Sequence, residues 1–445
     1  MPTRPELGWS DLRGRRVGLL GAGAEARAAL AHLRTLDADV VVVDDAPDRA
    51  TPELGAVLAT DAGGTAALLA CDVVVKAPGV PPDHPAVQRL LAAGGPVAGG
   101  LALWLHDADP SRVVCVTGTK GKSTTVTALG ALLAAAGHDV FVGGNLGAPP
   151  FDPAVGEHDL WVLEVSSYQA HDVATGPGVV GVTSLAPDHL SWHGGWDGYV
   201  RDKLSLCTRP RVEHVVVADE PGLRDHAGLL GTQVAWVDVP GPDHWSAAGP
   251  PGAHNRQNLA VAAGCVAALG LALPDDPAAA VAGAPALASR LQVVASAHGV
   301  DVVDDGLSTN DLSATAALEV HAGRPVALLV GGQDRGIDHD RLATAVASRR
   351  APTLVLGLAS NGPAILSALR RAGLPDHVEL VHATTADDDP SGLRDATARA
   401  VAWARGRGGV VLLSPASPSF DHFRDYRHRG EVFTSAAREA LGTDR

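Results

Sequence analysis

The stretch Val113-Val114-Cys115-Val116-Thr117-Gly118-Thr119-Lys120-Gly121-Lys122-Ser123-Thr124 decides the fold of the middle of the chain. Its apolar, β-branched start predicts a buried strand over 113–116, and the Ala- and Leu-rich residues that follow predict a helix to about Ala136. The glycines between them let backbone N–H groups wrap around an anion, and the positive end of the helix faces the same point. This order of strand, loop and helix indicates a phosphate loop in an α/β domain.

The loop is expected to bind a nucleotide. The residues concerned are Gly118, Thr119, Lys120, Gly121, Lys122, Ser123 and Thr124. Lys122 can neutralise the β- and γ-phosphates, and Ser123 or Thr124 can hold Mg²⁺. Two residues rather than four separate the glycines, so a glycine-rich turn without a ligand is the alternative. The order of the flanking elements favours nucleotide binding.

The first hundred residues predict a Rossmann-like sheet. The expected strands are Arg16–Leu20, Val40–Val43 and Val73–Val75. A glycine turn that contains Gly23 follows the first strand, and Asp44 lies about twenty residues further on, as in dinucleotide-binding folds. This glycine motif alone fits a tight turn without a ligand equally well.

The length of 445 residues suggests about two to four domains, and the alternating strand and helix patterns predict three α/β domains over residues 1–108, 109–288 and 289–445. The first and third are expected to be Rossmann-like and the second P-loop ATPase-like. Strands of the third domain are expected at Val300–Val303, Val326–Val330, Thr353–Leu356 and Val410–Leu413.

Composition excludes several classes of protein. With 35 Lys and Arg against 50 Asp and Glu, the net charge is −15, which argues against a nucleic-acid binder. The four cysteines form no CxxC pair and are expected to be buried in a reducing compartment. No apolar run reaches the length of a membrane span, and the N-terminal residues lack a signal-peptide pattern. These observations predict a cytoplasmic protein without a membrane partner.

Five further residues, in four segments of the chain, are candidates for chemistry, and each segment has a plainer interpretation. Glu164 follows the apolar run Leu160–Leu163 and could bind Mg²⁺, or could be a surface residue. His189 stands beside an Asp, an arrangement that is often only structural. Lys203 lies on a predicted helix, where a lysine is typically solvent-facing. Asn255 could cap the helix that follows it, or its amide and that of Asn258 could face a purine.

Polar loops follow three of the strands in the last domain, over residues 304–310, 331–336 and 414–421. Because the carboxyl ends of strands in open α/β sheets bind ligands, the three loops together suggest a substrate pocket.

Taken in order, these motifs resemble the Mur ligases, and within them the branch that adds glutamate (MurD type). The motifs are VTGTKGKST (116–124), GGNLG (143–147), LEVSSYQ (163–169), APDHLSWHG (186–194), HNRQN (254–258), GGQDRG (331–336) and LLSPASPSFDHFRDYRHRG (412–430). They cover nearly the whole chain and are specific only as a set.

The resemblance assigns a role to each matching position. It implies Lys122, His189 and Lys203 as catalytic residues, with Lys203 carbamylated. The implied ligands of two Mg²⁺ sites are Ser123, Glu164, His189 and Lys203. Besides the phosphate loop, the implied ATP contacts are Asn255, Asn258, Arg290 and Asp305. The implied substrate contacts are Gly23, Asp44, Asn145, Ser166, Gln169, Thr309, Arg335, Ser419 and Tyr426.

The resemblance also implies the reaction. ATP would phosphorylate the alanine carboxylate of UDP-N-acetylmuramoyl-L-alanine, and the amine of glutamate would attack the acyl phosphate. The protein is expected to act as a monomer. Addition of D-glutamate and a non-catalytic nucleotide-sugar-binding paralogue are the alternatives, and a folate-polyglutamate ligase would lack the N-terminal Rossmann-like domain.

Two departures from the family pattern bear on the substrates. Leu307 stands where members that add D-glutamate have a lysine that contacts its carboxylate, and losing such a cation costs about 1.5–3 kcal/mol unless Arg335 replaces it. The altered loop favours the subgroup that adds L-glutamate, whose product a separate epimerase inverts. Glu25 occupies a position that is usually small or hydroxylic, where an anion would repel a diphosphate unless it hydrogen-bonds the uracil.

Overall fold

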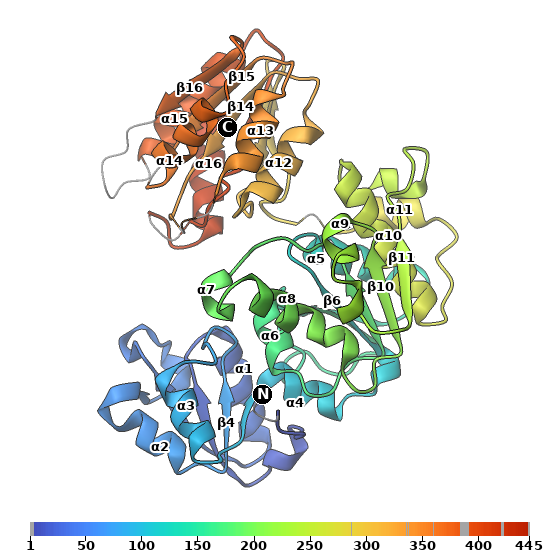
Figure 1. Ribbon diagram of the computed structural model, residues 1–445, viewed down its shortest axis with the longest axis vertical. Helices are drawn as coiled ribbons and strands as arrows, with labels where there is room; N and C mark the ends of the chain where they lie inside the picture. The colour runs from blue at the N-terminus through green and yellow to red at the C-terminus, as the bar shows by residue number, and fades with distance from the viewer. Residues whose placement is uncertain are drawn as a thin grey trace. The chain divides into compact units, whose positions relative to one another are not determined.

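The computed structural model of the chain describes residues 4–285, 287–334, 336, 338–358, 360–382, 391–419 and 422–443. Three β-sheets, each accompanied by helices, follow one another along the chain (Figure 1), which confirms the predicted α/β fold class. The chain divides into two compact units, residues 1–249 with 253–284 and residues 250–252 with 285–445. The first unit holds two sheets and the second unit holds one. The domain boundaries at 108 and 288 stay a prediction.

The first sheet is parallel throughout and has the strand order β3-β2-β1-β4-β5, which matches the first five strands of the Rossmann order 3-2-1-4-5-6. Its strands are β1 (Arg16–Leu20), β2 (Asp39–Asp44), β3 (Val57–Ala59), β4 (Val73–Lys76) and β5 (Val97–Gly99), and its helices are α1 (Ala24–Thr35), α2 (Thr65–Leu69), α3 (Pro85–Ala92) and α4 (Gly100–Asp107). The three predicted strands are confirmed. Apolar clusters form on both faces of this sheet, which explains why its central strands are apolar apart from their end residues.

The second sheet is also parallel, in the order β11-β10-β9-β6-β8-β7. Its strands are β6 (Val113–Thr117), β7 (Val140–Gly144), β8 (Leu160–Glu164), β9 (Val179–Val182), β10 (His214–Ala218) and β11 (Val234–Val237). The helices are α5 (Lys122–Ala135), α6 (Ser167–Asp172), α7 (Leu190–His193), α8 (Trp196–Leu204), α9 (Pro221–Arg224), α10 (Ala253–Ala268) and α11 (Pro277–Ala282). Strand β6 lies between β8 and β9, so the chain changes direction across the sheet at β6. Ligands bind at the carboxyl ends of strands at such a switch point.

The third sheet has the order β12-β13-β17-β14-β15-β16, and only β12 is antiparallel to its neighbour. Its strands are β12 (Gln292–Ala297), β13 (Val300–Asp304), β14 (Val326–Val330), β15 (Thr353–Gly357), β16 (Val378–His382) and β17 (Val410–Leu413). Its helices are α12 (Asp311–Val320), α13 (Asp340–Ala347), α14 (Gly362–Arg371), α15 (Ser391–Ala404) and α16 (Tyr426–Leu441). The four predicted strands are confirmed. Because β13, β17 and β14 are neighbours, the three polar loops after them start at one edge of the sheet.

Two predictions from composition can be compared with the structure. All four cysteines are free, and three of them, Cys115, Cys207 and Cys265, are buried, whereas Cys71 is half-buried. Among the described residues, no helix is both long enough and apolar enough to cross a membrane.

Candidate functional site

The phosphate loop lies at the carboxyl end of β6 and is held by the segment that follows β9. The N–H of Thr119 donates to the carbonyl of Ser184 (2.8 Å), and the N–H of Lys120 donates to Oγ of Ser184 (2.8 Å). Gly121 has φ of +91°, and a Cβ there would lie 2.2 Å from Oδ1 of Asn258. Only glycine fits this position without displacing its neighbour, so the loop has a conformation that its sequence requires.

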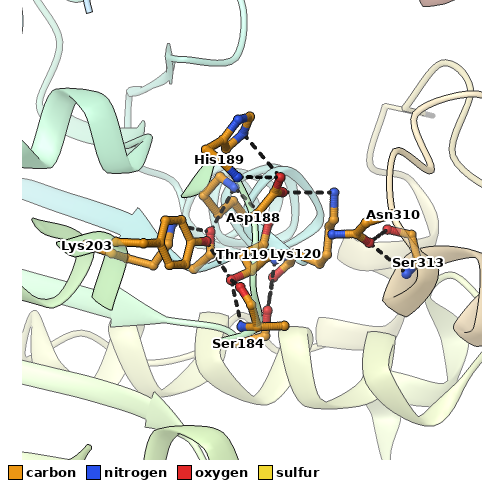
Figure 2. A network of polar contacts seen from close by, with 12 residues as sticks. Thr119, Lys120, Ser184, Asp188, His189, Lys203, Asn310 and Ser313 are labelled. Carbon is orange, nitrogen blue, oxygen red and sulfur yellow. Dashed lines mark hydrogen bonds and ion pairs between the residues drawn. The ribbon is translucent and has the colours of Figure 1, made fainter. Parts of the chain in front are cut away.

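Two lysines converge on one carbonyl oxygen of the loop. Nζ of Lys122 donates to the carbonyl oxygens of Gly118 (2.9 Å) and Thr119 (3.2 Å), and Nζ of Lys203 donates to that of Gly118 (2.8 Å). Figure 2 shows Lys203 pointing toward the loop beside Thr119. The arrangement places two amines at the loop that is predicted to bind phosphates.

Lys203 is 2% exposed, so the expectation that a helix lysine faces solvent is wrong here. Helix α8 packs its Lys203 face against the phosphate loop, and Nζ lies 5.0 Å from the centre of the Tyr199 ring. Burial, and next the charge of Lys122, hold the pKa of Lys203 well below its ordinary value. The amine is therefore less costly to keep uncharged at this position than on a surface helix.

Glu164 lies at the end of β8 and is 4% exposed, which rules out the surface alternative. Its Oε2 accepts from Oγ of Ser123 (2.5 Å), and its Oε1 accepts from Nδ2 of Asn145 (2.7 Å). The structure thus brings together three residues that were predicted from separate motifs. Hydroxyl and carboxylate oxygens are ligands that Mg²⁺ prefers, so Ser123 and Glu164 fit this ion chemically.

The carboxylate of Asp188 contacts both its neighbour His189 and Lys120 of the phosphate loop. Oδ1 of Asp188 accepts from the backbone N–H of His189 (3.0 Å) and lies 3.7 Å from its Nε2. Oδ2 of Asp188 lies 3.7 Å from Nζ of Lys120 (Figure 2). Burial alone would raise the pKa of Asp188, but the charges of Lys120, His189 and Lys122 lower it. Asp188 therefore lies between Lys120 of the phosphate loop and the predicted metal ligand His189.

The structure brings only part of the predicted set of metal ligands into contact. Within the ranges that the structure describes, no group of three or more His, Cys, Asp and Glu side chains is arranged to hold a metal ion. The Ser123–Glu164 pair is the part of the predicted set that lies in direct contact. The roles of His189 and Lys203 as ligands stay predictions.

The two asparagines of the HNRQN motif lie inside α10 and not before it. Asn255 is the third residue of that helix, so the interpretation that it caps the helix is wrong. Both side chains are buried, and Nδ2 of Asn258 lies 3.3 Å from Oδ1 of Asn255, within hydrogen-bonding distance. Since Asn258 also lies against Gly121, the amide pair is a direct neighbour of the phosphate loop.

Asp44, the last residue of β2, stabilises the glycine turn that follows β1. Its Oδ2 accepts from the N–H of Ala22 (2.7 Å), and its Oδ1 accepts from the N–H of Ala46 (2.7 Å). Gly23 occupies the residue just before α1 and is exposed. The carboxylate therefore fixes the loop that carries Gly23, and both predicted contacts lie at the carboxyl ends of β1 and β2.

Ser166 and Gln169 cap α6 reciprocally. Oγ of Ser166 accepts from the N–H of Gln169 (3.1 Å), and Oε1 of Gln169 accepts from the N–H of Ser166 (2.9 Å). The Nε2 of Gln169 then donates to Oε1 of Glu25 (2.7 Å), a residue of α1. Burial raises the pKa of Glu25 to about 7, so this carboxyl is partly neutral near physiological pH.

Two further polar contacts join helices of the second sheet to β4 and the segment that follows it. Nζ of Lys76, at the end of β4, lies 2.6 Å from Oδ2 of Asp172, at the end of α6, and the side chains are 4% and 9% exposed. The indole N–H of Trp192 donates to the carbonyl of Gly79 (3.2 Å). Helix α6 is therefore attached to the first sheet by a buried ion pair, and α7 by an exposed hydrogen bond.

In the second compact unit, the polar loops after β13 and β17 are joined by side chains. Oδ2 of Asp305 accepts from Oγ of Ser414 (2.7 Å), and burial raises the pKa of Asp305 to about 7. Arg290 and Thr309 are half-buried, and Ser419 is 2% exposed.

Two further predicted substrate contacts are Tyr426 and Arg335. Tyr426 is the first residue of α16, and its hydroxyl accepts from Nε of Arg427 (3.2 Å). Arg335 lies outside the described residues.

Comparison with known proteins identifies the family. Residues 116–237 match the family model of the Mur ligase middle domain. The chain is 41% identical to a UDP-N-acetylmuramoyl-L-alanine–L-glutamate ligase from a Micromonospora species, over 97% of this chain and 98% of the relative. Proteins of the same name from Salinispora tropica and Xanthomonas euvesicatoria are 40% and 39% identical over 97% and 96% of the chain, which covers 99% and 96% of those relatives. The chain belongs to the Mur ligase family.

Solved structures of Mur ligases share the fold at low sequence identity. The chain matches the UDP-N-acetylmuramate-alanine ligase MurC of Thermotoga maritima with a TM-score of 0.59 and 16% identity, over 96% of this chain and 100% of that one. The MurF ligase of Thermotoga maritima in complex with ADP gives 0.56 and 16%, over 98% and 100%. A folylpolyglutamate synthase of Mycobacterium tuberculosis gives 0.53 and 17%, but it covers only 75% of this chain and 92% of its own.

For this Mur ligase, sequence reasoning missed residues that act through buried contacts. The hydroxyl of Tyr199 lies 2.7 Å from Oγ1 of Thr119 and so supports the phosphate loop. Arg429 is 2% exposed, and its guanidinium donates to the carbonyl oxygens of Gly306 (2.9 Å), Ser417 (3.1 Å) and Pro418 (3.3 Å). It thereby joins two of the polar loops. An arginine after the long SPASPS motif gave no sign of being buried.

Proposed function

We propose that this Mur ligase joins glutamate to the alanine carboxylate of UDP-N-acetylmuramoyl-L-alanine, with cleavage of ATP to ADP and phosphate. The observation that carries the proposal is the near-complete match to three relatives named for this reaction, at 39–41% identity. The phosphate loop supports it, because its amines and the Ser123–Glu164 pair form the polar surroundings that phosphoryl transfer requires.

The reaction would proceed in two steps. A carboxylate oxygen of the alanine attacks the γ-phosphorus of ATP, the bond to the β,γ-bridging oxygen breaks, and ADP leaves. The glutamate amine then attacks the acyl carbon, loses a proton, and phosphate departs as the amide forms. Lys122 offsets the negative charge that develops on the transferred phosphoryl group. Asn255, Asn258, Arg290 and Asp305 are proposed as contacts of ATP.

Mg²⁺ is proposed to bind at Ser123 and Glu164. The fit rests on the donor chemistry, since a buried carboxylate and a hydroxyl lie in contact at the end of β8. When bound, the ion would neutralise phosphate charge. Asn145 would keep the carboxylate oriented through its 2.7 Å hydrogen bond to Oε1. A second ion is proposed at His189.

Lys203 is proposed to be carbamylated. Its amine is buried and lies near Lys122 and the phosphate loop, where the uncharged amine is favoured. Attack of this amine on CO₂ forms a carbamate and releases one proton. The carbamate would place a negative charge beside Lys122 and would supply an oxygen ligand for the second metal ion.

L-glutamate is proposed as the amino acid. Two observations support this: the curated relatives carry L-glutamate in their names, and Leu307, which is half-buried, stands where a lysine would pair with a D-glutamate carboxylate. Thr309, Arg335, Ser419 and Tyr426 are proposed to hold the amino acid. A monomeric, cytoplasmic enzyme followed by a glutamate epimerase completes the proposal.

The function is tested by phosphate release with purified protein, ATP and Mg²⁺. Release should require both UDP-N-acetylmuramoyl-L-alanine and glutamate, and mass spectrometry should show a product heavier by one glutamate residue. Release that is independent of either substrate, or a product of another mass, would reject the proposal. Lys122→Met, which removes the amine and keeps an unbranched side chain one atom shorter, serves as the inactive control.

A further inference from the structure

Asp202 is a buried carboxylate that none of the steps above uses. It lies on α8, directly before Lys203, and is 8% exposed. Its Oδ2 lies 2.7 Å from Nδ1 of His193, and its Oδ1 lies 3.0 Å from Nδ1 of His171. One carboxylate therefore contacts two imidazoles, with a different oxygen for each.

The two histidines belong to two other helices of the site. His171 is in α6, which Ser166 caps, and His193 ends α7, which begins directly after His189. Together with its own helix, Asp202 thus connects the three segments that carry the predicted substrate contact Ser166 and the predicted metal ligands His189 and Lys203. Each of these segments is short, and α7 has only four residues. A four-residue helix has little stability of its own and depends on such contacts for its position.

The contact continues from His193 to α6. Nε2 of His193 lies 2.9 Å from Oγ of Ser167, while its Nδ1 faces Asp202. Serine, histidine and aspartate in this order also occur in hydrolases, where the serine is a nucleophile. Here Ser167 is 3% exposed and the His193 side chain is 0% exposed, so no substrate can reach the hydroxyl. The arrangement is suited to holding the helices together and not to covalent catalysis.

Asp202 and Lys203 act on different sides of α8. Successive residues of a helix point about 100° apart, and Nζ of Lys203 reaches the phosphate loop at Gly118 while Asp202 faces α6 and α7. Asp202 thus lies behind the site and does not touch the reacting atoms. A residue that lies behind a site in this way usually acts by fixing the orientation of the side chains that line the site.

We propose that Asp202 is a positioning residue that, through His171 and His193, sets the relative placement of Ser166, His189 and Lys203. The inference rests on the proposed glutamate ligase function. His171 contributes through the 3.0 Å contact between its Nδ1 and Oδ1 of Asp202. A carboxylate that accepts from Nδ1 of His193 keeps the proton of that imidazole on Nδ1, so Nε2 of His193 accepts the hydroxyl proton of Ser167. Removing the charge would release this tautomer and allow α7 and α8 to shift.

The test compares Asp202→Asn with Asp197→Asn. Both variants lose one carboxylate from α8, but Asp197 is exposed in the first turn and contacts neither histidine in the described structure. Asp202→Asn should lower kcat about ten- to hundredfold and raise the Mg²⁺ concentration for half-maximal rate, the range found when residues behind metal ligands are changed. The KM for ATP should stay close to that of the unchanged protein, and Asp197→Asn should behave like the unchanged protein in all three measurements.

A second pair of variants checks the route through His193. The amide nitrogen of asparagine can occupy the place of Nδ1, so His193→Asn should keep most of the activity that His193→Ala loses. This rescue is specific for the contact with Asp202. Equal loss in both variants would overturn the inference. So would an Asp202→Asn protein in which all KM values and the melting temperature change together, because that pattern indicates general unfolding.

A measurement without substrates separates this inference from the proposed function. ¹H–¹⁵N spectra of the imidazoles in the protein alone should show His193 protonated at Nδ1, and this state should be lost in Asp202→Asn. If the unchanged protein releases no phosphate with glutamate, the proposed function fails, while these spectra still decide whether Asp202 fixes the histidines. Unchanged imidazole signals in the variant would overturn the inference.

Discussion

The ion pair between Lys76 and Asp172 should make a large contribution to the stability of the first compact unit. The two side chains are 4% and 9% exposed, and Nζ lies 2.6 Å from Oδ2. Lys76→Met preserves the volume but leaves Asp172 buried without a cation. Breaking a buried pair in this way costs about 3–5 kcal/mol, because the remaining charge is uncompensated.

The change can be followed by urea unfolding with tryptophan fluorescence. Seven of the eight tryptophans lie in the first unit, and only Trp403 lies in the second, so the signal reports mainly on the first unit. At about 2–4 °C per kcal/mol, the melting temperature should also fall by roughly 6–20 °C. Arg16→Met is the matched control. Its pair with Asp39 is 3.6 Å long with side chains 47% and 72% exposed, and such surface pairs contribute about 0–1 kcal/mol.

The double variant Lys76→Met/Asp172→Asn completes the test. Because it leaves no uncompensated charge, it should recover much of the stability that Lys76→Met loses, and the two changes should not be additive. Two results would refute the reasoning: a loss for Lys76→Met no larger than that for Arg16→Met, or additive losses in the double variant. Either result would mean that the pair is hydrated in solution.

Three further changes have defined outcomes. Burial raises the pKa of Glu25 from 4.5 to about 7, so the unchanged protein loses stability as the pH rises through this range. The free energy of unfolding of Glu25→Gln should therefore equal that of the unchanged protein near pH 4 and exceed it by up to about 3 kcal/mol at pH 8. A pH-independent difference in urea midpoints would contradict this. Lys203→Ala should lose phosphate release and recover part of it with added short-chain carboxylic acids, whereas undiminished activity would exclude an essential carbamate. Gly121→Ala would place a Cβ 2.2 Å from Asn258 Oδ1 and should abolish measurable binding of ATP in calorimetry, and normal affinity would show that the loop can relax.

Much of the fold was predictable because buried parallel strands have continuous β-branched runs. Arg16–Leu20, Val326–Val330 and the start of β6 are strands with the expected bounds or within one residue of them. Strands β3 and β5 have only three residues each, and runs that short give no periodic signal.

The site was predictable where a motif lies on one segment, and not where distant segments meet. The phosphate loop and the position of Glu164 after a strand followed from local patterns. The burial of Lys203 did not, because it depends on which face of α8 packs on the loop. Likewise, the contact between Glu25 and Gln169 joins residues 144 positions apart, and a single sequence contains no signal for such a pair.

The enantiomer of glutamate tests the central claim most directly. Phosphate release would be measured with UDP-N-acetylmuramoyl-L-alanine, ATP and Mg²⁺, and either L- or D-glutamate supplied at equal concentrations. The proposed function predicts a clear preference for L-glutamate in kcat/KM, with an L-glutamyl product. A preference for D-glutamate would contradict the interpretation of Leu307, and no release with either enantiomer would contradict the ligase assignment itself.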